Sequence, residues 1–416
     1  MRIAIVGGSI AGCTAAIELG RSGHDVVVFE RSKGGLTGRG AGIGTPTDTL
    51  EKLIERDLVD AAIPRVTVAN YPMVGRRDGI DRYGRTALVL PLHMALLNWG
   101  DLWNQLRKRV PEGEYLGGRI VASARQEDER VFVTTSNGST DTFDLVLFGD
   151  GYRSRGRTLL FPDVEVSYRG YVLWRGVLEE QYLSETGPLE SSLFRLHYKG
   201  LPGNAVFYFV PGIDGSIKPG ERWVNWACYV PVTPEDLPEF LVDREGQRHD
   251  FSLPPGSLRS DEEQRLKGLM TDHLPIYFSE IIAQSHDTFA QPIYTSVVPA
   301  YVRGRMGLLG DAGSVAPPFT GSGVFKAVMN AVDLSAALES ADSVEEGLAR
   351  WSHEQTERGY RLAALGSQME RAFVWDAPDL ATLSEDGART WWANAVKFPD
   401  EFRYLGEAGS KTTKGA

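Results

Sequence analysis

Residues 2–12 read RIAIVGGSIAG, an apolar run that passes into closely spaced glycines. Residues 3–6 are apolar at every position, which predicts a strand buried on both faces of a parallel sheet. Small and apolar residues with helical spacing follow at 13–22, and a second strand, DVVVFE, is predicted at 25–30. This order of strand, glycine turn, helix and strand predicts a Rossmann-like unit that binds a dinucleotide.

The glycine turn has the small residues that such a site needs. Gly7 permits the tight turn, Gly12 permits close packing of helix on strand, and Ser9 is a small residue where a middle glycine is usual. A pyrophosphate can then reach the free N–H groups at the helix N-terminus. Glu30 follows at the spacing, roughly 20 residues, of an acid that accepts a ribose hydroxyl. A structural glycine turn in another α/β unit is the alternative.

Composition places the chain among ordinary globular proteins. It has 44 Lys and Arg against 55 Asp and Glu, and the resulting charge of −11 argues against a nucleic-acid partner. No apolar run approaches the roughly 18 residues of a membrane span, so we expect no membrane partner. Two cysteines are too few for a disulfide framework, and the 7 histidines lack metal-binding spacing. We therefore expect a cytoplasmic protein without a metal site.

Two further glycine clusters follow apolar strands. The strand predicted at 143–148 ends in Gly149-Asp150-Gly151, and the segment 304–313 contains Gly310-Asp311. The second cluster continues through PPFTGSG at 317–323 into a predicted helix. Taken singly, Asp150 is most simply explained as a helix N-cap or turn residue.

The three glycine motifs, in this order, resemble those of the single-component FAD-dependent aromatic hydroxylases, a family of flavoprotein monooxygenases. Four further stretches resemble the branch that contains 2,6-dihydroxypyridine 3-hydroxylase: ERS at 30–32, LTGRGAGI at 36–43, YRGYVLWRG at 168–176, and Lys326-Ala327. The resemblance extends from residue 1 to about residue 360. The positions that depart from the wider family are Trp99, Gly313-Ser314 and Asn330.

The resemblance implies that FAD is the cofactor. Asp311 is then expected to bind the ribityl chain, Asp150 to serve FAD and nicotinamide positioning, and backbone N–H groups at 320–324 to lie near the isoalloxazine. NADH or NADPH is the implied co-substrate. The full set of expected cofactor contacts is Gly7, Ser9, Ile10, Ala11, Gly12, Glu30, Arg31, Gly42, Val121, Asp150, Asp311, Gly321, Ser322, Gly323 and Val324.

The pattern changes between about 166 and 290, where short alternating strands rich in aromatic residues are separated by turns. Together with the resemblance, this predicts an α/β fold: a Rossmann-like FAD-binding domain with an inserted β-rich (α+β) substrate domain and a C-terminal helical segment. We expect the FAD-binding domain at 1–165 and 290–370, and the substrate domain at 166–289. The C-terminal helical segment and tail are expected at 371–416.

The resemblance also implies a reaction. NAD(P)H and O2 would be used to hydroxylate a small activated aromatic or N-heteroaromatic ring, such as a hydroxypyridine or phenol, through a flavin hydroperoxide. A base or hydrogen-bonding group in the pocket would activate the ring. The candidates on expected substrate-domain strands are His197 and Tyr208, with Tyr229 as an alternative, although for each the favoured interpretation is an ordinary outward-facing side chain. Pro317 either directs carbonyl groups toward flavin and substrate or only shapes its loop.

Other activities are compatible with the same sequence features. Epoxidation and Baeyer–Villiger oxidation use the same cofactor, and a flavin-binding partner without catalytic activity is a further alternative. A flavin halogenase is disfavoured, because Trp223-Val224-Asn225-Trp226 does not match the Trp-x-Trp-x-Ile-Pro segment of that class. The expected partners are a small aromatic substrate and O2, and the chain is expected to be a monomer or a homodimer.

Overall fold

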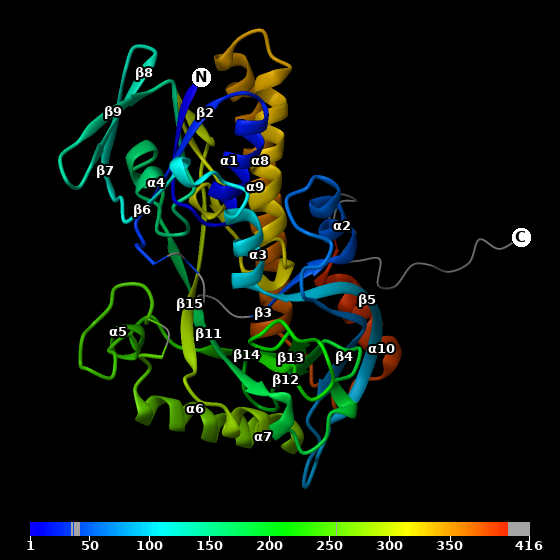
Figure 1. The fold of residues 1–416 in the computed structure, drawn as a ribbon. Helices are drawn as coiled ribbons and strands as arrows, with labels where there is room; N and C mark the ends of the chain where they lie inside the picture. Colours follow the sequence, from blue (N-terminus) through cyan, green and yellow to red (C-terminus); the bar gives the residue numbers. More distant parts are fainter. Residues whose placement is uncertain (35, 37–41, 255, 398–416) are drawn as a thin grey trace, which may run out of the picture.

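The computed structural model describes residues 1–34, 36, 42–254 and 256–397. Two sheets lie one above the other in Figure 1, with the N-terminus in the upper one. The order of the six-stranded upper sheet is β16–β17–β10–β1–β2–β6. Its strands are β1 (Arg2–Val6), β2 (Asp25–Glu30), β6 (Tyr115–Gly117), β10 (Leu145–Phe148), β16 (Val302–Arg303) and β17 (Met306–Leu308).

The centre of the upper sheet is β1, which pairs in parallel with both β2 and β10. Ile3 lies opposite Val26 on one side and Leu145 on the other, and all three side chains are fully buried or nearly so. Helix α1 packs against α8, and α8 packs against α9. The predicted Rossmann-like order is confirmed, with an α-helix between two parallel strands.

The lower sheet has nine strands in the order β18–β15–β11–β14–β13–β12–β4–β5–β3. Neighbouring strands run antiparallel, except that β12 and β4 are parallel. Its strands are β3 (Gly42–Pro46), β4 (Val66–Gly75), β5 (Arg85–Asn98), β11 (Ser167–Glu179), β12 (Phe194–His197), β13 (Asn204–Val210), β14 (Trp223–Pro231), β15 (Phe289–Val297) and β18 (Ser314–Val315). The sheet therefore combines strands of the segment 166–289 with strands that lie before and after it.

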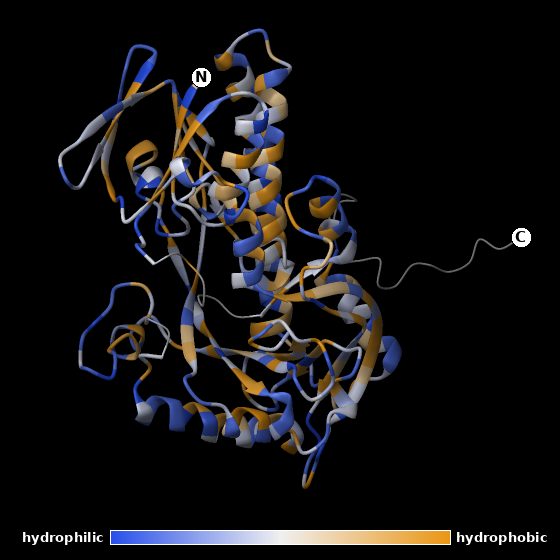
Figure 2. Cartoon of the chain, viewed as in Figure 1, coloured by the Kyte–Doolittle hydropathy of each residue, from blue (hydrophilic) through white to orange (hydrophobic). Residues whose placement is uncertain are grey.

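The two faces of the lower sheet bury different side chains, because successive residues of a strand point to opposite faces. The outer face, which includes Trp174, Phe207 and Trp226, forms one core with α6 and α7. In Figure 2, α6 carries hydrophilic residues along its outer side, while Leu266 and Met270 are buried against the sheet. The inner face includes Tyr171, Arg195, Tyr208 and Tyr229, and its core is shared with Phe319, the end of α9 and α10.

The other elements complete the two layers. A small sheet is formed by β7 (Val121–Glu127), β8 (Arg130–Thr135) and β9 (Thr140–Phe143). The helices are α1 (Ile10–Arg21), α2 (Thr47–Glu55), α3 (Trp99–Arg107), α4 (Arg155–Leu160), α5 (Leu237–Phe240), α6 (Ser260–His273), α7 (Ile276–Gln284), α8 (Gly323–Glu339), α9 (Val344–Glu370) and α10 (Glu385–Ala395). A π-helical turn, Arg371–Trp375, follows α9 directly. Part of the expected segment 371–416 is thus helical, and its residues from 398 onward lie outside the described residues.

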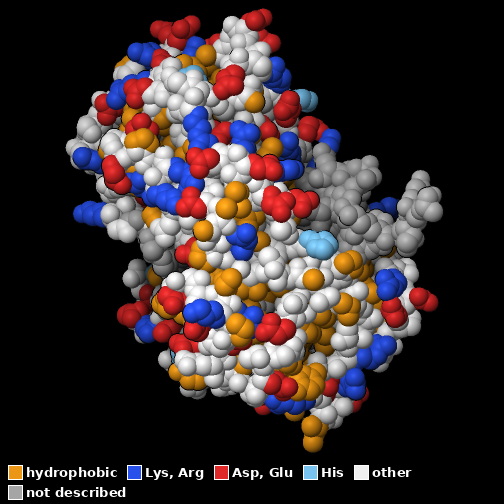
Figure 3. Space-filling model, turned by 45° about the vertical axis from the view of Figure 1, so that its right-hand side comes forward, with side chains coloured by type: hydrophobic (Ala, Val, Ile, Leu, Met, Phe, Trp, Pro, Cys, Tyr) orange, Lys and Arg blue, Asp and Glu red, His pale blue; other side chains and the backbone are white. Residues whose placement is uncertain are grey.

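The surface gives two further observations. Within the described residues, no helix is both long and apolar enough to cross a membrane. Figure 3 shows acidic and basic side chains intermingled over the upper part of one face, with hydrophobic side chains gathered over its lower part. The negative charge of the chain is therefore not concentrated in one acidic patch on that face. The α/β fold expected from the sequence is confirmed by the two sheets and their helices.

Candidate active site

The turn between β1 and α1 is closely surrounded by backbone. Gly7 has a φ of 103°, and a Cβ atom there would lie 2.5 Å from the Gly149 carbonyl oxygen. A Cβ atom on Gly12 would lie 1.9 Å from the Gly7 carbonyl oxygen. Both positions therefore require glycine, because a Cβ atom at either one would clash with a backbone oxygen. Gly7 also has a positive φ, which side chains other than that of glycine disfavour. The same contacts bring the second glycine motif, with Asp150, beside the first.

Glu30, at the end of β2, reaches the glycine turn as expected from its position. Its Oε2 atom accepts a hydrogen bond of 2.9 Å from the Gly8 N–H, and its Oε1 atom accepts one of 2.8 Å from the Ser32 N–H. Ser9 is the N-cap residue of α1 but makes no side-chain capping bond. Ile10 and Ala11 are buried in the first turn of the helix, whereas Arg31 is exposed.

Asp150 binds the start of α4. Its Oδ2 atom accepts hydrogen bonds from the N–H groups of Arg155 (2.7 Å) and Gly156 (3.3 Å), and its Oδ1 atom accepts one from the Ser154 hydroxyl. Burial raises the pKa of the Asp150 carboxyl, and these hydrogen bonds lower it. The geometry matches the helix-capping interpretation of this motif.

The third motif contacts the other two. A Cβ atom on Gly310 would lie 3.2 Å from the Ala11 Cβ atom. The buried Arg157 guanidinium donates to the carbonyl oxygens of Asp311 (3.1 Å) and Ala312 (3.2 Å), and so joins α4 to the Gly-Asp turn. The three glycine motifs, far apart in the sequence, therefore meet around the N-terminus of α1.

A buried lysine holds the Asp311 carboxylate. Lys326 of α8 is only 4% exposed, and its Nζ atom lies 2.7 Å from the Asp311 Oδ1 atom, while the Asp311 side chain itself is half exposed. Asn330, one turn further along the helix, accepts a hydrogen bond of 2.7 Å from the Gly310 N–H. No role for Lys326 was expected from the sequence. The signal that could have indicated one is a lysine in the run VFKAVMNAV, in which Asn330 is the only other polar residue.

The N-terminus of α8 faces open space. Gly321 has a φ of 61°, and added Cβ atoms at Gly321 or Gly323 would meet nothing within 4 Å. Ser322 is buried and its hydroxyl lies 2.7 Å from the Thr320 hydroxyl, while Val324 packs against the core of the upper layer. The free N–H groups at this helix end can donate hydrogen bonds to a ligand, because the two glycines leave space in front of them.

Gly42, the first residue of β3, is held by three other strands of the lower sheet. Its carbonyl oxygen accepts hydrogen bonds from Arg175 Nη2 (2.6 Å) and Tyr208 Oη (2.9 Å), and its N–H donates to Asn225 Oδ1 (2.9 Å). The Arg175 Nε and Asn225 Nδ2 atoms are buried, and neither has a hydrogen-bond partner within the described part of the chain.

Val121, at the start of β7, is buried, and its carbonyl oxygen accepts from Arg155 Nη1 at 3.3 Å.

Aromatic rings cover the inner face of the lower sheet beside Gly42. The ring of Phe319, in the loop after the Gly-Asp motif, lies 4.5 Å from the Tyr229 ring and 6.3 Å from the Tyr171 ring. Burial raises the pKa of Tyr229 to about 12, and it raises the pKa of Tyr208 too. Both phenols are thus protonated at neutral pH and act as hydrogen-bond donors rather than bases.

His197 lies on the same face but further along the strands. It lies opposite Asn204 of β13. Because Asn204 precedes Tyr208 by four residues, His197 and Tyr208 are separated by roughly 13 Å along the strand direction. Its ring is 5.2 Å from the Trp391 ring, and neither ring nitrogen has a partner within the described residues. Burial, aided by the charge of Arg195, lowers its pKa to about 3.

Pro317 is buried against α9. A Cβ atom on Gly366 of that helix would lie 2.7 Å from the Pro317 Cδ atom. The following Pro318 begins the short 3₁₀ turn Pro318–Thr320, which carries Phe319 over the inner face. The contact fits the loop-shaping interpretation of Pro317, and it places the loop between the Gly-Asp motif and the aromatic rings.

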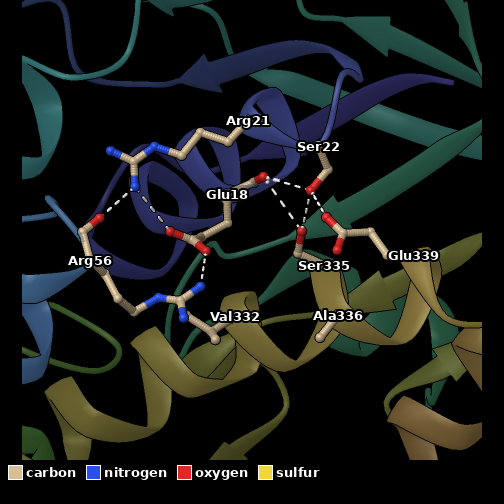
Figure 4. Close-up of a pocket in the computed structure, with 8 residues that line it drawn as sticks. All are labelled: Glu18, Arg21, Ser22, Arg56, Val332, Ser335, Ala336 and Glu339. Atoms are coloured by element: carbon tan, nitrogen blue, oxygen red, sulfur yellow. Dashed lines mark hydrogen bonds and ion pairs between the residues drawn. The ribbon is translucent and has the colours of Figure 1, made fainter.

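A separate surface pocket of about 420 Å³ opens near the C-terminal end of α1. In Figure 4, Glu18 pairs with Arg21 and Arg56, and Ser22 bonds to Ser335. Its charged groups pair with one another, and it lies about 15 Å along α1 from the glycine turn. We therefore place the candidate active site at the glycine motifs and the inner face, not at this pocket.

Comparisons with known proteins match the two parts of the chain that contribute to this region. Residues 5–51 match the family model of the NAD(P)-binding Rossmann-like domain, and residues 168–295 match that of the FAD binding domain-like family. The 2,6-dihydroxypyridine 3-monooxygenase of Paenarthrobacter nicotinovorans is 28% identical over 370 residues, covering 86% of this chain and 88% of the relative. The aurachin C monooxygenase/isomerase of Stigmatella aurantiaca is 27% identical, covering 90% and 91%. The chain is thus similar to FAD-dependent monooxygenases over most of its length.

Solved structures share the fold of this monooxygenase. The 2,6-dihydroxypyridine-3-hydroxylase from Arthrobacter nicotinovorans superposes with a TM-score of 0.81 at 24% identity, covering 91% of this chain and 93% of that one. HpxO of Klebsiella pneumoniae, complexed with FAD and uric acid, has a TM-score of 0.72 at 18% identity and covers 98% and 96%. The chain is an oxidoreductase with FAD as its cofactor, as the sequence predicted.

Proposed function

We propose that this monooxygenase uses NADH or NADPH and O2 to hydroxylate a small activated aromatic or N-heteroaromatic ring of the hydroxypyridine or phenol type. The observation that supports this best is the aromatic lining of the inner face beside Gly42, where the Phe319 and Tyr229 ring centroids lie 4.5 Å apart. Its similarity to 2,6-dihydroxypyridine 3-monooxygenase over 86% of the chain supports the same class of ring.

The glycine motifs have the geometry to hold FAD. The N-terminus of α8 has open space beside Gly321 and Gly323, so that its backbone N–H groups can reach a flavin ring or a phosphate. In this proposal Asp311, whose side chain is half exposed, accepts the ribityl hydroxyls, and Glu30 accepts a ribose hydroxyl in addition to the Gly8 N–H. When bound and reduced, FAD supplies the reactivity toward O2, and the protein supplies orientation and a dry site.

The inner face supplies donors rather than a base. Tyr208 donates to the Gly42 carbonyl oxygen, and the high pKa of Tyr229 keeps its hydroxyl protonated. The depressed pKa of His197 and its position beside Trp391 make it a poor proton acceptor at neutral pH. In this proposal the substrate ring is oriented and polarised by hydrogen-bond donors, and it is bound in its ionised, electron-rich form.

The test is a screen of hydroxylated pyridines, benzoates and phenols with the purified holoenzyme. NADH and NADPH are added separately without oxygen, and the loss of oxidised-flavin absorbance is followed. Aeration in ¹⁸O2 should then restore the absorbance and place one labelled oxygen on the ring, as seen by mass spectrometry. A flavin that neither nucleotide reduces with any of these rings would contradict the proposal. An epoxide or a ring-expanded lactone as product would replace hydroxylation by one of the alternative oxidations.

A further inference from the structure

Two buried amide side chains connect α8 to α9 beside the Gly-Asp motif. Asn330 of α8 and Gln355 of α9 are each 1% exposed, and Asn330 Nδ2 donates a hydrogen bond of 2.8 Å to Gln355 Oε1. On its other side, Asn330 Oδ1 accepts the Gly310 N–H at 2.7 Å. The fully buried Trp351 donates its indole N–H to the Asn330 carbonyl oxygen at 2.9 Å. A chain of hydrogen bonds therefore leads from the third glycine motif into the interface between the two helices.

This chain of hydrogen bonds ends in an ion pair near the surface. Gln355 Nε2 donates to Asp333 Oδ2 at 3.0 Å, and Arg358 Nη1 lies 2.6 Å from the same oxygen. Arg358 Nη1 also donates to Gln355 Oε1 at 3.0 Å. The Asp333 and Arg358 side chains are 20% and 28% exposed, so this end of the chain reaches solvent. Each helix supplies its two residues three positions apart, which places both on the face turned to the other helix.

The ion pair determines which way the Gln355 amide points. The two ends of an amide group are nearly equal in size, but the oxygen accepts hydrogen bonds and the nitrogen donates them. A guanidinium only donates, and a carboxylate only accepts. With the amide reversed, its nitrogen would face the Arg358 donor and its oxygen would face the Asp333 carboxylate. Two repulsive contacts would then replace two hydrogen bonds, so only one orientation of Gln355 is compatible with the ion pair.

Gln355 in turn determines the orientation of the Asn330 amide. Its Oε1 atom is an acceptor, so the nitrogen end of Asn330 must face it. The oxygen end of Asn330 is then directed at the Gly310 N–H. Reversal of this amide would oppose two donors at Gly310 and two acceptors at Gln355, in a buried place where unmade hydrogen bonds are costly. The polarity set by the ion pair is thus transmitted to the Gly310 N–H.

The oriented amide holds the Gly-Asp turn together with a charged neighbour. Gly310 has a φ of 58°, and a Cβ atom there would lie 3.2 Å from the Ala11 Cβ atom at the start of α1. Lys326, one helical turn before Asn330, pairs with the Asp311 carboxylate at 2.7 Å. One face of α8 therefore holds two successive residues of the turn, the first by its N–H and the second by its side chain.

We propose that Arg358, Asp333 and Gln355 are positioning residues for FAD, which act on the Gly310-Asp311 turn through the Asn330 amide. These three residues and Asn330 form an amide relay that begins at the surface and ends at the third glycine motif. The proposal rests on the proposed contact of Asp311 with the ribityl chain, and it requires no contact between the other relay residues and the cofactor.

The experiment measures the dissociation constant of FAD, by flavin fluorescence during titration of the full-length apoprotein, and the unfolding temperature with and without FAD. Gln355→Met keeps a side chain of similar length and removes both hydrogen-bonding ends. We expect it to raise the dissociation constant about tenfold, because the Asn330 amide loses the acceptor that orients it. Arg358→Met should raise it about threefold, and Arg358→Lys should restore part of the affinity. The gain in unfolding temperature on adding FAD should decrease in the same order.

Matched variants on α9 separate positioning from helix packing. Arg350→Met removes an arginine that donates to the last turn of α8, and Gln368→Met removes a glutamine that donates to α10. Both should leave the dissociation constant of FAD unchanged. A Gln355→Met protein with unchanged affinity, and with equal losses of unfolding temperature with and without FAD, would overturn the proposal. Unchanged affinity in Arg358→Met would overturn it too, and this partly exposed residue decides the question if Gln355→Met does not fold.

A further variant distinguishes the amide relay from the contact on which it rests. If Asp311→Asn binds FAD as tightly as the unmodified protein while Gln355→Met does not, the proposed ribityl contact fails and the relay to the Gly310 N–H stands. None of these measurements uses NAD(P)H or an aromatic substrate. Failure of the proposed hydroxylation would therefore leave their outcome unaffected.

Discussion

The two faces of the nine-stranded sheet differ in whether their buried polar side chains have hydrogen-bond partners. On the outer face the buried indole N–H groups of Trp174 and Trp226 donate to the hydroxyls of Thr288 and Ser285, at 2.9 and 2.8 Å. On the inner face the His197 nitrogens are buried without partners among the described residues. The same strands supply both faces, so the difference lies in what covers them. The outer face is completed by the chain itself, and the inner face retains donors for a ligand.

The same contrast separates two buried arginines of this sheet. Arg222, over the Phe209 ring, has Glu180 Oε1 at 2.6 Å and also pairs with Glu190. Arg195 on the inner face has neutral partners only among the described residues. Folding therefore pairs the Arg222 guanidinium with carboxylates, whereas the Arg195 guanidinium is left available to a ligand.

The largest expected effect is on the outer face. Arg222→Met should lower the free energy of unfolding by about 3–5 kcal/mol, because it leaves the buried Glu180 carboxylate without its partner. Urea denaturation of the holoenzyme measures this. Arg195→Met is the matched variant on the inner face, and it should cost much less stability, since no carboxylate is left unpaired. Equal losses in the two variants would contradict the contrast between the faces.

A pH effect of intermediate size is expected from His197. Its folded pKa, about 3, lies below the ordinary value of 6.5, so the unfolded chain binds a proton that the folded protein does not. Stability from this group is full above pH 6.5 and falls as the pH decreases, by about 2 kcal/mol between pH 7 and pH 5. His197→Gln should flatten that part of the curve of unfolding free energy against pH. Substitution of the exposed His93 by Gln should leave the curve unchanged.

A smaller effect tests the buried Lys326, which pairs with Asp311, the residue proposed to bind the ribityl chain. Lys326→Met should weaken FAD binding about tenfold, because Asp311 loses the charged group that positions its carboxylate. Flavin fluorescence during titration of the apoprotein measures the dissociation constant. Lys326→Arg keeps the charge and should recover part of the affinity. An unchanged affinity in Lys326→Met would show that Asp311 is positioned without the lysine.

The smallest effect is expected where β13 and β3 of the lower sheet meet at Gly42. Tyr208→Phe removes one of the two donors to the Gly42 carbonyl oxygen and should lower the free energy of unfolding by about 1 kcal/mol. The Arg175 donor remains, so FAD should still bind. The flavin absorbance spectrum and urea denaturation together check this. A complete loss of flavin would assign Tyr208 a larger role than the two-donor geometry indicates.

The sequence predicted the local parts of this molecule well. The glycine turn and Glu30 are close in sequence and governed by short-range geometry, so their contact could be inferred from spacing. The strands β3, β4 and β5 could not be placed in the lower sheet, because pairing over such distances leaves no local pattern. The surroundings of Arg195 and His197 also depend on strand register, which decides the face that each side chain occupies.

The composite origin of the lower sheet has a consequence for protein engineering. Because β3, β4 and β5 precede the segment 166–289 and β18 follows it, that segment is not a self-contained cassette. A chimera that exchanges residues 166–289 with those of a relative would pair foreign strands with the native β4 and would present a foreign side chain at the place of Arg175 to the native Gly42. If the inner face binds the substrate as proposed, point substitutions there should alter specificity with less disturbance of the fold than recombining blocks.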